Sequence, residues 1–336
     1  MHVPDGFFNA ATSVSAGVVA AAGIGVCLTK ARRELDDRTA PMAGLVAAFI
    51  FAVQMLNFPV AAGTSGHLLG GALAAILVGP YTGVLCMAVV LLVQCVFFAD
   101  GGLTALGINI SIMGIVTVLV GWGVFRLVSR FARGKGGITL AAFLGALVSV
   151  PAAALVFALL FAIGGTAPIS PLAVAAAMGG VHVLIGIGEA IITALTVGAV
   201  LAVRPDLVYG ARGLARTLVL RGADGSTSEV GTAPAPAPAA RGSLKPFLLG
   251  GVGLTLVLAG AVSFFANSNP DGLEAVAEQK GFLGQAKDHF TNWALSGYGE
   301  VGGIPVGIAG IIGVGLVLLI AGAVAWAARG RRKAEV

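Results

Sequence analysis

The N-terminal residues Met1 and His2 combine three nitrogen atoms that can bind one metal ion. The terminal amine and the backbone amide nitrogen of His2 close one chelate ring, and the same amide and the imidazole Nδ1 close a second. The metal must replace the amide proton, which suits late first-row ions such as Ni(II), Cu(II) and Co(II). The chelate requires that Met1 stays on the chain, and the bulky neighbour His2 favours this. We therefore predict a metal-binding arm, the alternative being an ordinary histidine in a frayed terminus.

Composition places this arm on a membrane protein. Apolar residues make up 57% of the sequence and charged residues 10%, and the mean hydropathy is +0.98. Such values are typical of a polytopic membrane protein. The net charge of +5 lies mainly in the loops, so it indicates topology and gives no reason to expect nucleic-acid binding. The three cysteines are expected to be small core residues because none has metal-ligand spacing.

Seven apolar helical segments are expected before residue 205. The third is shorter than the ~20 residues that a perpendicular span needs, so we expect a broken or partly inserted helix that lines a protein cavity. The segments cover residues 12–29, 41–58, 67–80, a fourth ending at 99, a fifth ending at 126, 138–163 and 171–203.

Basic residues set the expected orientation. Lys30, Arg32, Arg33 and Arg38 follow the first helix, and such clusters mark the cytoplasmic side of a membrane. With this threading every Lys and Arg up to Lys245 is cytoplasmic. The Met1 arm and the start of the third segment, which carries His67, are then both outside.

The second half of the chain changes in composition. Residues 206–245 are basic and rich in Ala and Pro, which predicts an extended cytoplasmic linker. Two further helices, 246–266 and 303–328, enclose an outer loop, 267–302, with an acidic excess. We therefore expect an all-α polytopic membrane protein with the N-terminus outside and the C-terminus in the cytoplasm. It comprises a seven-helix module (1–205), the linker (206–245) and a two-helix transmembrane hairpin (246–336).

His67 can complete the metal site. It lies on the same expected face as His2, next to Gly63 and Gly66, which permit close backbone approach. A fourth nitrogen in the plane of the first three makes a site that suits Ni(II), can take Co(II), and is poor for Mg(II) or Ca(II). The residues do not choose between cobalt and nickel.

Several sequence motifs are similar to those of the CbiM/NikM family, the substrate-binding membrane subunits of energy-coupling-factor (ECF) importers for cobalt and nickel. They are MHVPDGF (1–7), GTSGHLLGG (63–71), DGGLTALG (100–107) and GIGEAIIT (186–193). The loop SNPDGLE (268–274) resembles the PDGLE domain, a CbiN/NikN-like component fused here to the same chain. The resemblance covers about residues 1–205 and implies metal ligands at the Met1 amine, the His2 amide and imidazole, and His67.

Other polar residues are weaker candidates. Asp5, Asp100 and Asn109 are expected on the outer side, where they could orient a ligating imidazole or form caps and turns. Glu189 and His182 lie within the seventh helix. A carboxylate at that depth is a functional hypothesis by default, and Glu189 is open to contacting partners, bracing helices or staying protonated. Packing is the favoured role for His182.

The leading functional hypothesis is a substrate-capture subunit in a bacterial plasma membrane. The sequence has no GxxxxGK[ST] motif, so we expect no ATP hydrolysis and no enzyme activity in this chain. The resemblance implies a separate coupling subunit (CbiQ/NikQ-like) and ATPase subunits (CbiO/NikO-like). The alternative is an ion channel or proton-coupled carrier that uses Glu189 and His182. A metalloenzyme and a vitamin-binding subunit are disfavoured, the first because no HExxH motif is present and the second because only 7% of residues are aromatic.

Overall fold

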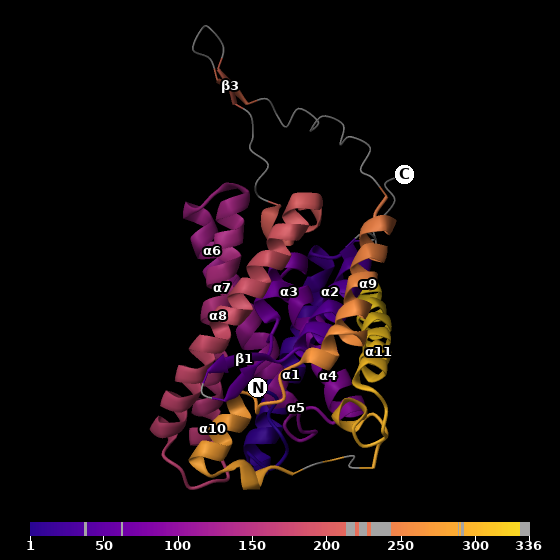
Figure 1. Cartoon of the computed structure of the whole chain (residues 1–336). Coiled ribbons are helices and arrows are strands. Elements are labelled where there is room, and N and C mark those ends of the chain that lie inside the picture. Colours follow the sequence, from indigo (N-terminus) through magenta and orange to yellow (C-terminus); the bar gives the residue numbers. More distant parts are fainter. Residues whose placement is uncertain are drawn as a thin grey trace.

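The computed structural model describes residues 1–36, 39–61, 63–212, 219–221, 227–229, 243–287, 289 and 292–329. Most of the expected linker, 206–245, lies outside these residues, as do Arg38 and the last seven residues. The described chain is mostly helical, as predicted, and its helices form one bundle (Figure 1).

Seven helices in the described part of the chain are long and apolar enough to cross a membrane. They make the protein a multi-pass membrane protein, because each can satisfy its own backbone hydrogen bonds in lipid. These spans are α1 (Ala10–Lys30, extended by a turn to Arg33), α4 (Pro80–Phe98), α5 to α6 (Leu106–Phe131), α7 (Gly134–Gly164), α8 (Pro171–Val203), α9 with η5 (Lys245–Phe265) and α11 (Val306–Ala328).

Two further helices are too short to span. Helix α2 (Thr39–Gln54) has 16 residues, and α3 (Gly71–Val78) has 8. Every residue of α3 is buried, and α2 is buried almost throughout. Helix α3 packs against α4, α6 and α7, while α2 packs against α9, α11 and α4. Short helices are therefore tolerated here because protein, and not lipid, surrounds them.

The second helix ends earlier than the sequence predicted. It stops at Gln54, and β1 (Phe58–Ala61) then pairs antiparallel with β2 (Thr64–Gly66). Pro59 accounts for the difference, because it has no N–H to bond the Met55 carbonyl and its ring would clash with that carbonyl in a continued helix. A second two-stranded sheet, β3 (Val219–Arg221) with β4 (Thr227–Glu229), follows α8. The strictly all-α expectation is therefore wrong at these two places.

The turn after β2 leads directly into the buried helix α3. His67 follows β2, and Gly70 caps α3 with a φ of +90°, which a residue with a side chain rarely adopts. This sharp entry fixes the start of α3 next to the β1–β2 hairpin. His67 is therefore held between two defined elements and not on a free loop.

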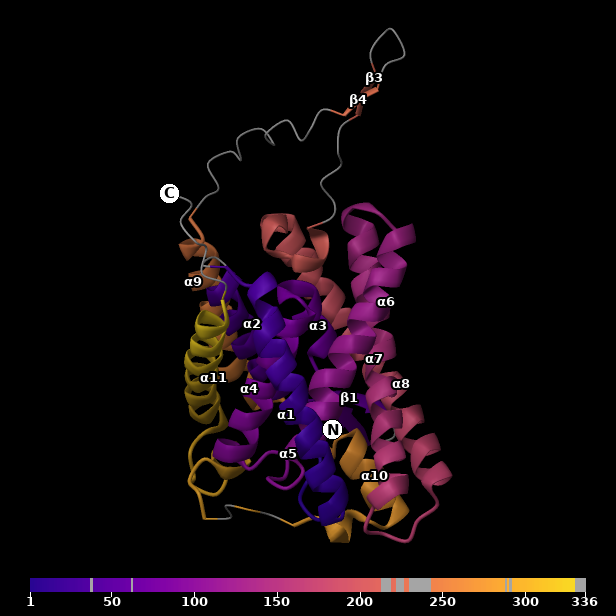
Figure 2. The ribbon, with the colours of Figure 1, turned by 180° about the vertical axis from the view of Figure 1, so that it is seen from behind.

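Helices α9 and α11 of the C-terminal hairpin form one edge of the bundle, on the side away from α6, α7 and α8 (Figure 2). Helices α9 and α11 touch closely at Gly307, where an added Cβ would lie 2.2 Å from the Gly260 carbonyl oxygen. Small residues at such contacts allow helix backbones to approach in lipid. Between α9 and α11 the chain crosses the end of the bundle with α10 (Gly272–Lys280), η6 (Leu283–Gln285) and η7 (Ser296–Gly299). Helix α10 packs against α8.

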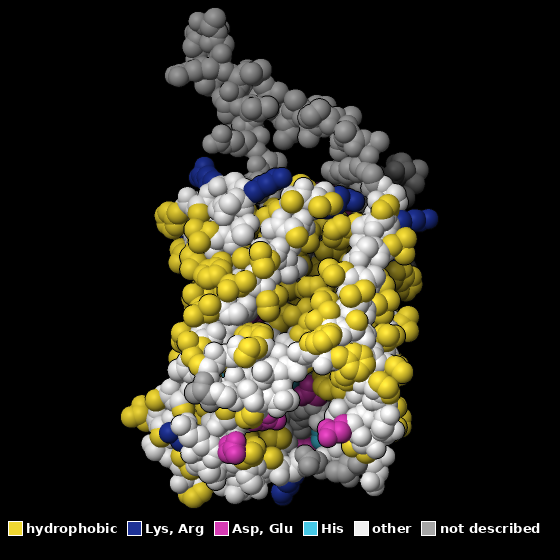
Figure 3. All heavy atoms as spheres, in the orientation of Figure 1, with side chains coloured by type: hydrophobic (Ala, Val, Ile, Leu, Met, Phe, Trp, Pro, Cys, Tyr) yellow, Lys and Arg dark blue, Asp and Glu magenta, His cyan; other side chains and the backbone are white. Residues whose placement is uncertain are grey.

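The two ends of the bundle differ in charge (Figure 3). The end opposite the N-terminal arm is ringed by cations, including Arg33, Arg126, Arg130, Lys135 and Arg212 around one open cavity. Acidic and histidine side chains are visible at the other end, beneath a broad apolar belt. The basic end is the one where the threading places the basic loops, although Lys or Arg side chains are also visible at the other end (Figure 3).

Candidate metal centre

The N-terminal arm is fixed along its length. Asn109 accepts a hydrogen bond from the Val3 N–H at 2.8 Å and donates one to the Val3 carbonyl at 3.0 Å. Asp5 accepts from the backbone N–H of Leu103 and of Thr104 at 3.1 and 2.7 Å. Val3 has no exposed surface. The arm is therefore hydrogen-bonded and buried in this structure, unlike a frayed terminus.

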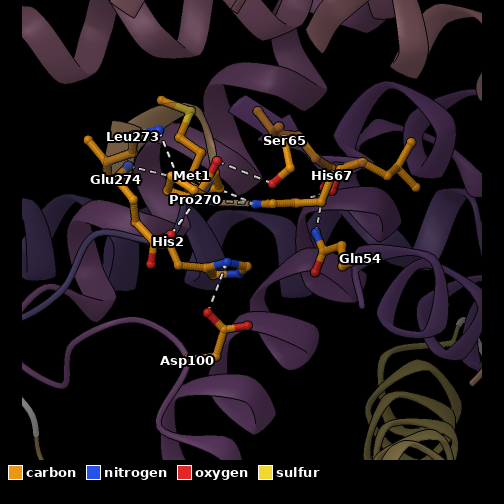
Figure 4. Close-up of polar contacts among 12 residues, drawn as sticks. Met1, His2, Gln54, Ser65, His67, Asp100, Pro270, Leu273 and Glu274 are labelled. Carbon is orange, nitrogen blue, oxygen red and sulfur yellow. Dashed lines mark hydrogen bonds and ion pairs between the residues drawn. The ribbon is translucent and has the colours of Figure 1, made fainter. Parts of the chain in front are cut away.

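Two of the predicted ligand atoms meet directly. The Met1 amine nitrogen lies 2.5 Å from His67 Nε2 (Figure 4). The other ring nitrogen of His67, Nδ1, lies 2.9 Å from the Leu68 carbonyl oxygen, so it donates its N–H there and leaves a lone pair on Nε2. Met1 and His67 are 2% and 4% exposed. The Met1 amine nitrogen and His67 Nε2 are thus buried in direct contact with each other.

The His2 ring stacks on the His67 ring. Their centroids are 5.1 Å apart and their planes are inclined by 18°. His2 Nδ1 lies 3.1 Å from Asp100 Oδ1, and Nε2 lies 3.1 Å from Gln94 Oε1. Nδ1 is the atom that the predicted chelate requires, so closing the chelate needs a rotation of the His2 ring away from Asp100.

Burial lowers the pKa of the His2 imidazole to about 4, against the opposing effect of Asp100. The ring is therefore neutral at physiological pH, and its contact with Asp100 is a hydrogen bond and not an ion pair. A neutral imidazole is the form that binds a metal.

Asp271, from the hairpin, contacts the same two residues, Met1 and His67. Its Oδ2 contacts the Met1 amine and lies 3.5 Å from His67 Nε2. Burial opposes ionisation of Asp271, but the neighbouring Met1 ammonium holds the pKa of its carboxyl well below the usual range. An anion from one domain therefore lies against two predicted ligands from the other.

Tyr298, also from the hairpin, completes the surroundings of His2. Its hydroxyl donates to Asp100 Oδ2 at 2.6 Å and accepts from Gln94 Nε2 at 3.3 Å. Burial and the neighbouring Asp100 raise the pKa of Tyr298 well above its usual value, so the hydroxyl keeps its proton. Asp100, Tyr298 and Gln94 thus surround the His2 ring. The neutral imidazole has a single N–H, which it donates to Asp100, so its contact with Gln94 Oε1 is not a second hydrogen bond.

Glu189 and His182 both lie on α8 and are buried, but they make different contacts. Glu189 accepts hydrogen bonds from the backbone N–H groups of Leu69 and Gly70 at 2.6 and 3.0 Å. His182 Nδ1 lies 2.8 Å from the Met178 carbonyl of its own helix. Its Nε2 has no hydrogen-bond partner among the described residues, and its ring lies beside the start of α10 at Gly272.

The predicted site residues therefore fall into three groups. Met1, His2, His67 and Asp100 come together; Asp5 and Asn109 hold the arm without touching either imidazole of the site; Glu189 and His182 lie on α8. Sequence reasoning missed Gln94, Tyr298 and the position of Asp271. Gln94 could have been noticed as a lone amide in the apolar helix α4, and Asp271 as the acid of the PDGLE motif. No group of three His, Cys, Asp or Glu side chains in the described chain has metal-binding geometry.

Two family matches cover most of the chain. Residues 2–207 match CbiM, described as the cobalt uptake substrate-specific transmembrane region. Residues 245–330 match the PDGLE domain. The resemblance drawn from the sequence motifs is confirmed for both parts.

Individual relatives agree with these matches. The chain is 40% identical over 208 residues to the putative fused nickel transport protein NikMN of Archaeoglobus fulgidus, covering 62% of this chain and 68% of that one. It is 35% identical over 190 residues to the cobalt transport protein CbiM of Sorangium cellulosum, covering 55% and 83%. A crystal structure of a truncated transition metal transporter is similar with a TM-score of 0.55 and 29% identity, covering 60% of this chain and 99% of that one. The CbiM match covers more than half of this chain. The chain therefore belongs to the CbiM family, and a C-terminal PDGLE domain is joined to it.

Proposed function

We propose that this protein is the substrate-capture membrane subunit of an ECF-type importer for divalent cobalt or nickel. The observation that carries the proposal is the 2.5 Å approach of the Met1 amine to His67 Nε2, with the His2 ring stacked on that of His67. Atoms far apart in the sequence converge in a buried place that is rich in nitrogen. Late first-row metals are the ions for which such donors are selective.

Metal binding at this site has a defined proton balance. One M²⁺ ion replaces one proton of the Met1 ammonium and the amide proton of His2, while the His2 imidazole is already neutral and His67 Nε2 offers a lone pair. Two protons are released for each ion bound. Before and after binding the site carries one net positive charge, so the buried surroundings need not change their own charge.

The charge distribution supports an outward-facing site. The cations that line the open cavity, among them Arg126, Arg130 and Arg212, lie at the end of the bundle opposite the arm. Positively charged ends face the cytoplasm. We therefore place the arm outside and the linker inside a bacterial plasma membrane, where the arm meets the incoming ion.

ATP-driven transport then requires partners, because no ATP-binding motif is present in the sequence. We expect a CbiQ/NikQ-like coupling membrane subunit and CbiO/NikO-like ATPases, and we expect this chain not to be an enzyme. The relatives carry both nickel and cobalt names, and cobalt and nickel share the ligand set. We therefore propose both cobalt and nickel as substrates.

The C-terminal hairpin contacts the N-terminal arm and holds it in position. Its Lys287 N–H donates to the Asp5 carbonyl at 2.9 Å, His289 Nδ1 lies 3.1 Å from Asp5, and Tyr298 reaches Asp100. We propose that the outer loop, 267–302, positions the arm for metal loading. Deletion of this loop should slow uptake although the proposed nitrogen ligands remain; unchanged uptake would contradict this role.

The geometry does not favour the channel or proton-coupled carrier. Both oxygens of Glu189 accept hydrogen bonds from backbone N–H groups, and one nitrogen of His182 bonds within its own helix. A carboxylate engaged in this way is suited to holding the backbone rather than relaying protons. A single histidine, His182, does not form a proton or ion pathway across the membrane.

The test is metal binding by the purified full-length protein. Titration with Ni(II) or Co(II) should give tight 1:1 binding, d–d absorption bands of a nitrogen-rich site, and release of two protons per ion in weakly buffered solution. A large excess of Mg(II) should not compete, because oxygen-seeking ions bind such sites poorly. Failure to bind either ion, or equal competition by Mg(II), would contradict the proposal.

A further inference from the structure

Asp271 Oδ2 lies at the junction of two proposed metal ligands. It contacts the Met1 amine nitrogen and lies 3.5 Å from His67 Nε2, while those two nitrogens are 2.5 Å apart. Metal–nitrogen and metal–oxygen bonds in proteins are both roughly 2 Å long. An ion that bonds to both nitrogens from the side of Asp271 has this oxygen as an immediate neighbour. On that side the oxygen must either bond to the ion or be displaced by it.

The structure holds Asp271 firmly. Its other oxygen, Oδ1, accepts from the N–H groups of Leu273 and Glu274 at 2.7 and 2.9 Å, which caps helix α10. Glu274 in turn accepts from the Asp271 N–H. The carboxylate is thus fixed through Oδ1, and Oδ2 is left to face Met1 and His67.

The loop that carries Asp271 is also tied to the strand before His67. The Ser65 N–H donates to the Pro270 carbonyl at 2.9 Å, and the Ser65 hydroxyl donates to the Asn269 carbonyl at 2.7 Å. Ser65 belongs to β2, and His67 follows that strand directly. Movement of Asp271 away from His67 would break these bonds, so displacement is the costlier of the two outcomes.

Charge favours bonding as well. The four nitrogen donors include one anionic amide, so a bound divalent ion leaves a net charge of +1. The Asp271 side chain is 13% exposed and that of Met1 is 1% exposed. An unpaired charge in such surroundings is costly, whereas a paired one is not.

We propose that Asp271 of the PDGLE domain is an oxygen ligand of the transported ion, added to the nitrogen donors of the arm and His67. This inference rests on the proposed metal-capture function and extends it. The bound ion then has a donor from each domain, and it is five-coordinate rather than planar. The PDGLE domain thereby takes part in binding the substrate as well as in holding the arm.

The experiment compares full-length wild type with Asp271→Asn. Asparagine also caps helices well, so α10 should keep its start while the anionic oxygen is lost. Glu274→Gln is the matched control, because it removes a neighbouring carboxylate from the same capping box that does not contact Met1 or His67. Thermal melting without metal checks that all three proteins are folded.

X-ray absorption at the metal edge and visible absorption then report the coordination of bound Ni(II) and Co(II). We expect a five-coordinate spectrum for wild type and Glu274→Gln, and a planar four-coordinate spectrum for Asp271→Asn. We also expect the affinity of Asp271→Asn to fall by about tenfold or more, at least the effect of losing a residue that supports a metal site.

Two outcomes overturn the inference. In one, Asp271→Asn gives the wild-type spectrum at unchanged affinity; in the other, it binds more weakly with an unchanged spectrum, so that Asp271 only holds the ammonium. A His67→Ala variant separates this failure from failure of the proposed function. If His67→Ala loses binding while Asp271→Asn keeps the wild-type spectrum, the capture site stands without the oxygen ligand. If His67→Ala binds as wild type does, the proposed site itself is wrong.

Discussion

The Glu189 carboxylate accepts hydrogen bonds from the backbone N–H groups of both Leu69 and Gly70, at 2.6 and 3.0 Å. These residues connect His67 to helix α3, whose first turn has no side-chain cap of its own. A buried carboxylate on α8 therefore supplies the acceptor that this helix start lacks. Of the three roles considered from sequence, bracing is the one that these contacts support.

Replacement of Glu189 should therefore loosen His67. Glu189→Ala leaves two buried N–H groups without an acceptor, at a cost of about 1–3 kcal/mol each. Glu189→Gln keeps one good acceptor and should lose less. Melting temperature and Ni(II) affinity should fall together, in the order wild type, Gln, Ala. A Glu189→Gln protein with normal melting and transport but altered proton coupling would instead favour the carrier alternative.

Asn109 should matter for metal binding without touching the metal. Asn109→Leu keeps the side-chain volume but removes both hydrogen bonds to Val3. We expect metal affinity to fall by about tenfold, as for residues that orient ligands. Ser129→Ala, at the opposite basic end, is the control. Equal affinities for wild type and Asn109→Leu would show that the arm is held adequately by its other contacts.

The two buried histidines His67 and His182 offer a matched comparison. His67→Ala removes a proposed ligand and should weaken Ni(II) and Co(II) binding by at least about 100-fold, the upper end of the loss seen for supporting residues. His182→Leu removes an imidazole of similar burial from α8, where its ring lies beside Gly272, and should weaken binding much less than His67→Ala. Competition titration measures both. A larger loss for His182→Leu than for His67→Ala would place the ion on α8.

Tyr298→Phe tests the contact between the hairpin and His2. The change removes a hydrogen bond to the Asp100 carboxylate, and bonds to charged groups contribute about 1.5–3 kcal/mol. We expect a lower melting temperature and a severalfold loss of metal affinity, since His2 loses its fixed neighbours. Tyr81→Phe, at the opposite end of the bundle, controls for the loss of a hydroxyl. Identical behaviour of the two variants would argue against the contacts around His2.

The sequence predicted the meeting of Met1 and His67 because topology alone places both on one face. The expected orientation rests on the positions of Lys and Arg, and those positions are readable without a structure. The spans 171–203 and 306–328 were also well predicted, α11 within three residues of its start, since apolar length and flanking charges define such helices. These features depend on local composition.

Features that depend on contacts between distant segments were not predicted. Nothing local shows that Asp271 packs on Met1 or that Tyr298 reaches Asp100, because each pair is separated by nearly 200 residues or more. The β1–β2 hairpin was missed since apolar residues around Phe58 continue the helical pattern, although Pro59 does not. The sequence did not decide between the three roles of Glu189, because the backbone N–H groups that it binds lie before a different helix, α3.

The central claim is that the terminal amine and the His2 amide bind the ion, and one Ala inserted between Met1 and His2 tests it most directly. The insertion keeps every side chain but changes the chelate rings. Ni(II) and Co(II) titrations of the purified protein should then show lost or strongly weakened binding and no nitrogen-field d–d bands. Wild-type affinity and spectrum in the inserted protein would contradict the claim and leave the site to His67 and its neighbours alone.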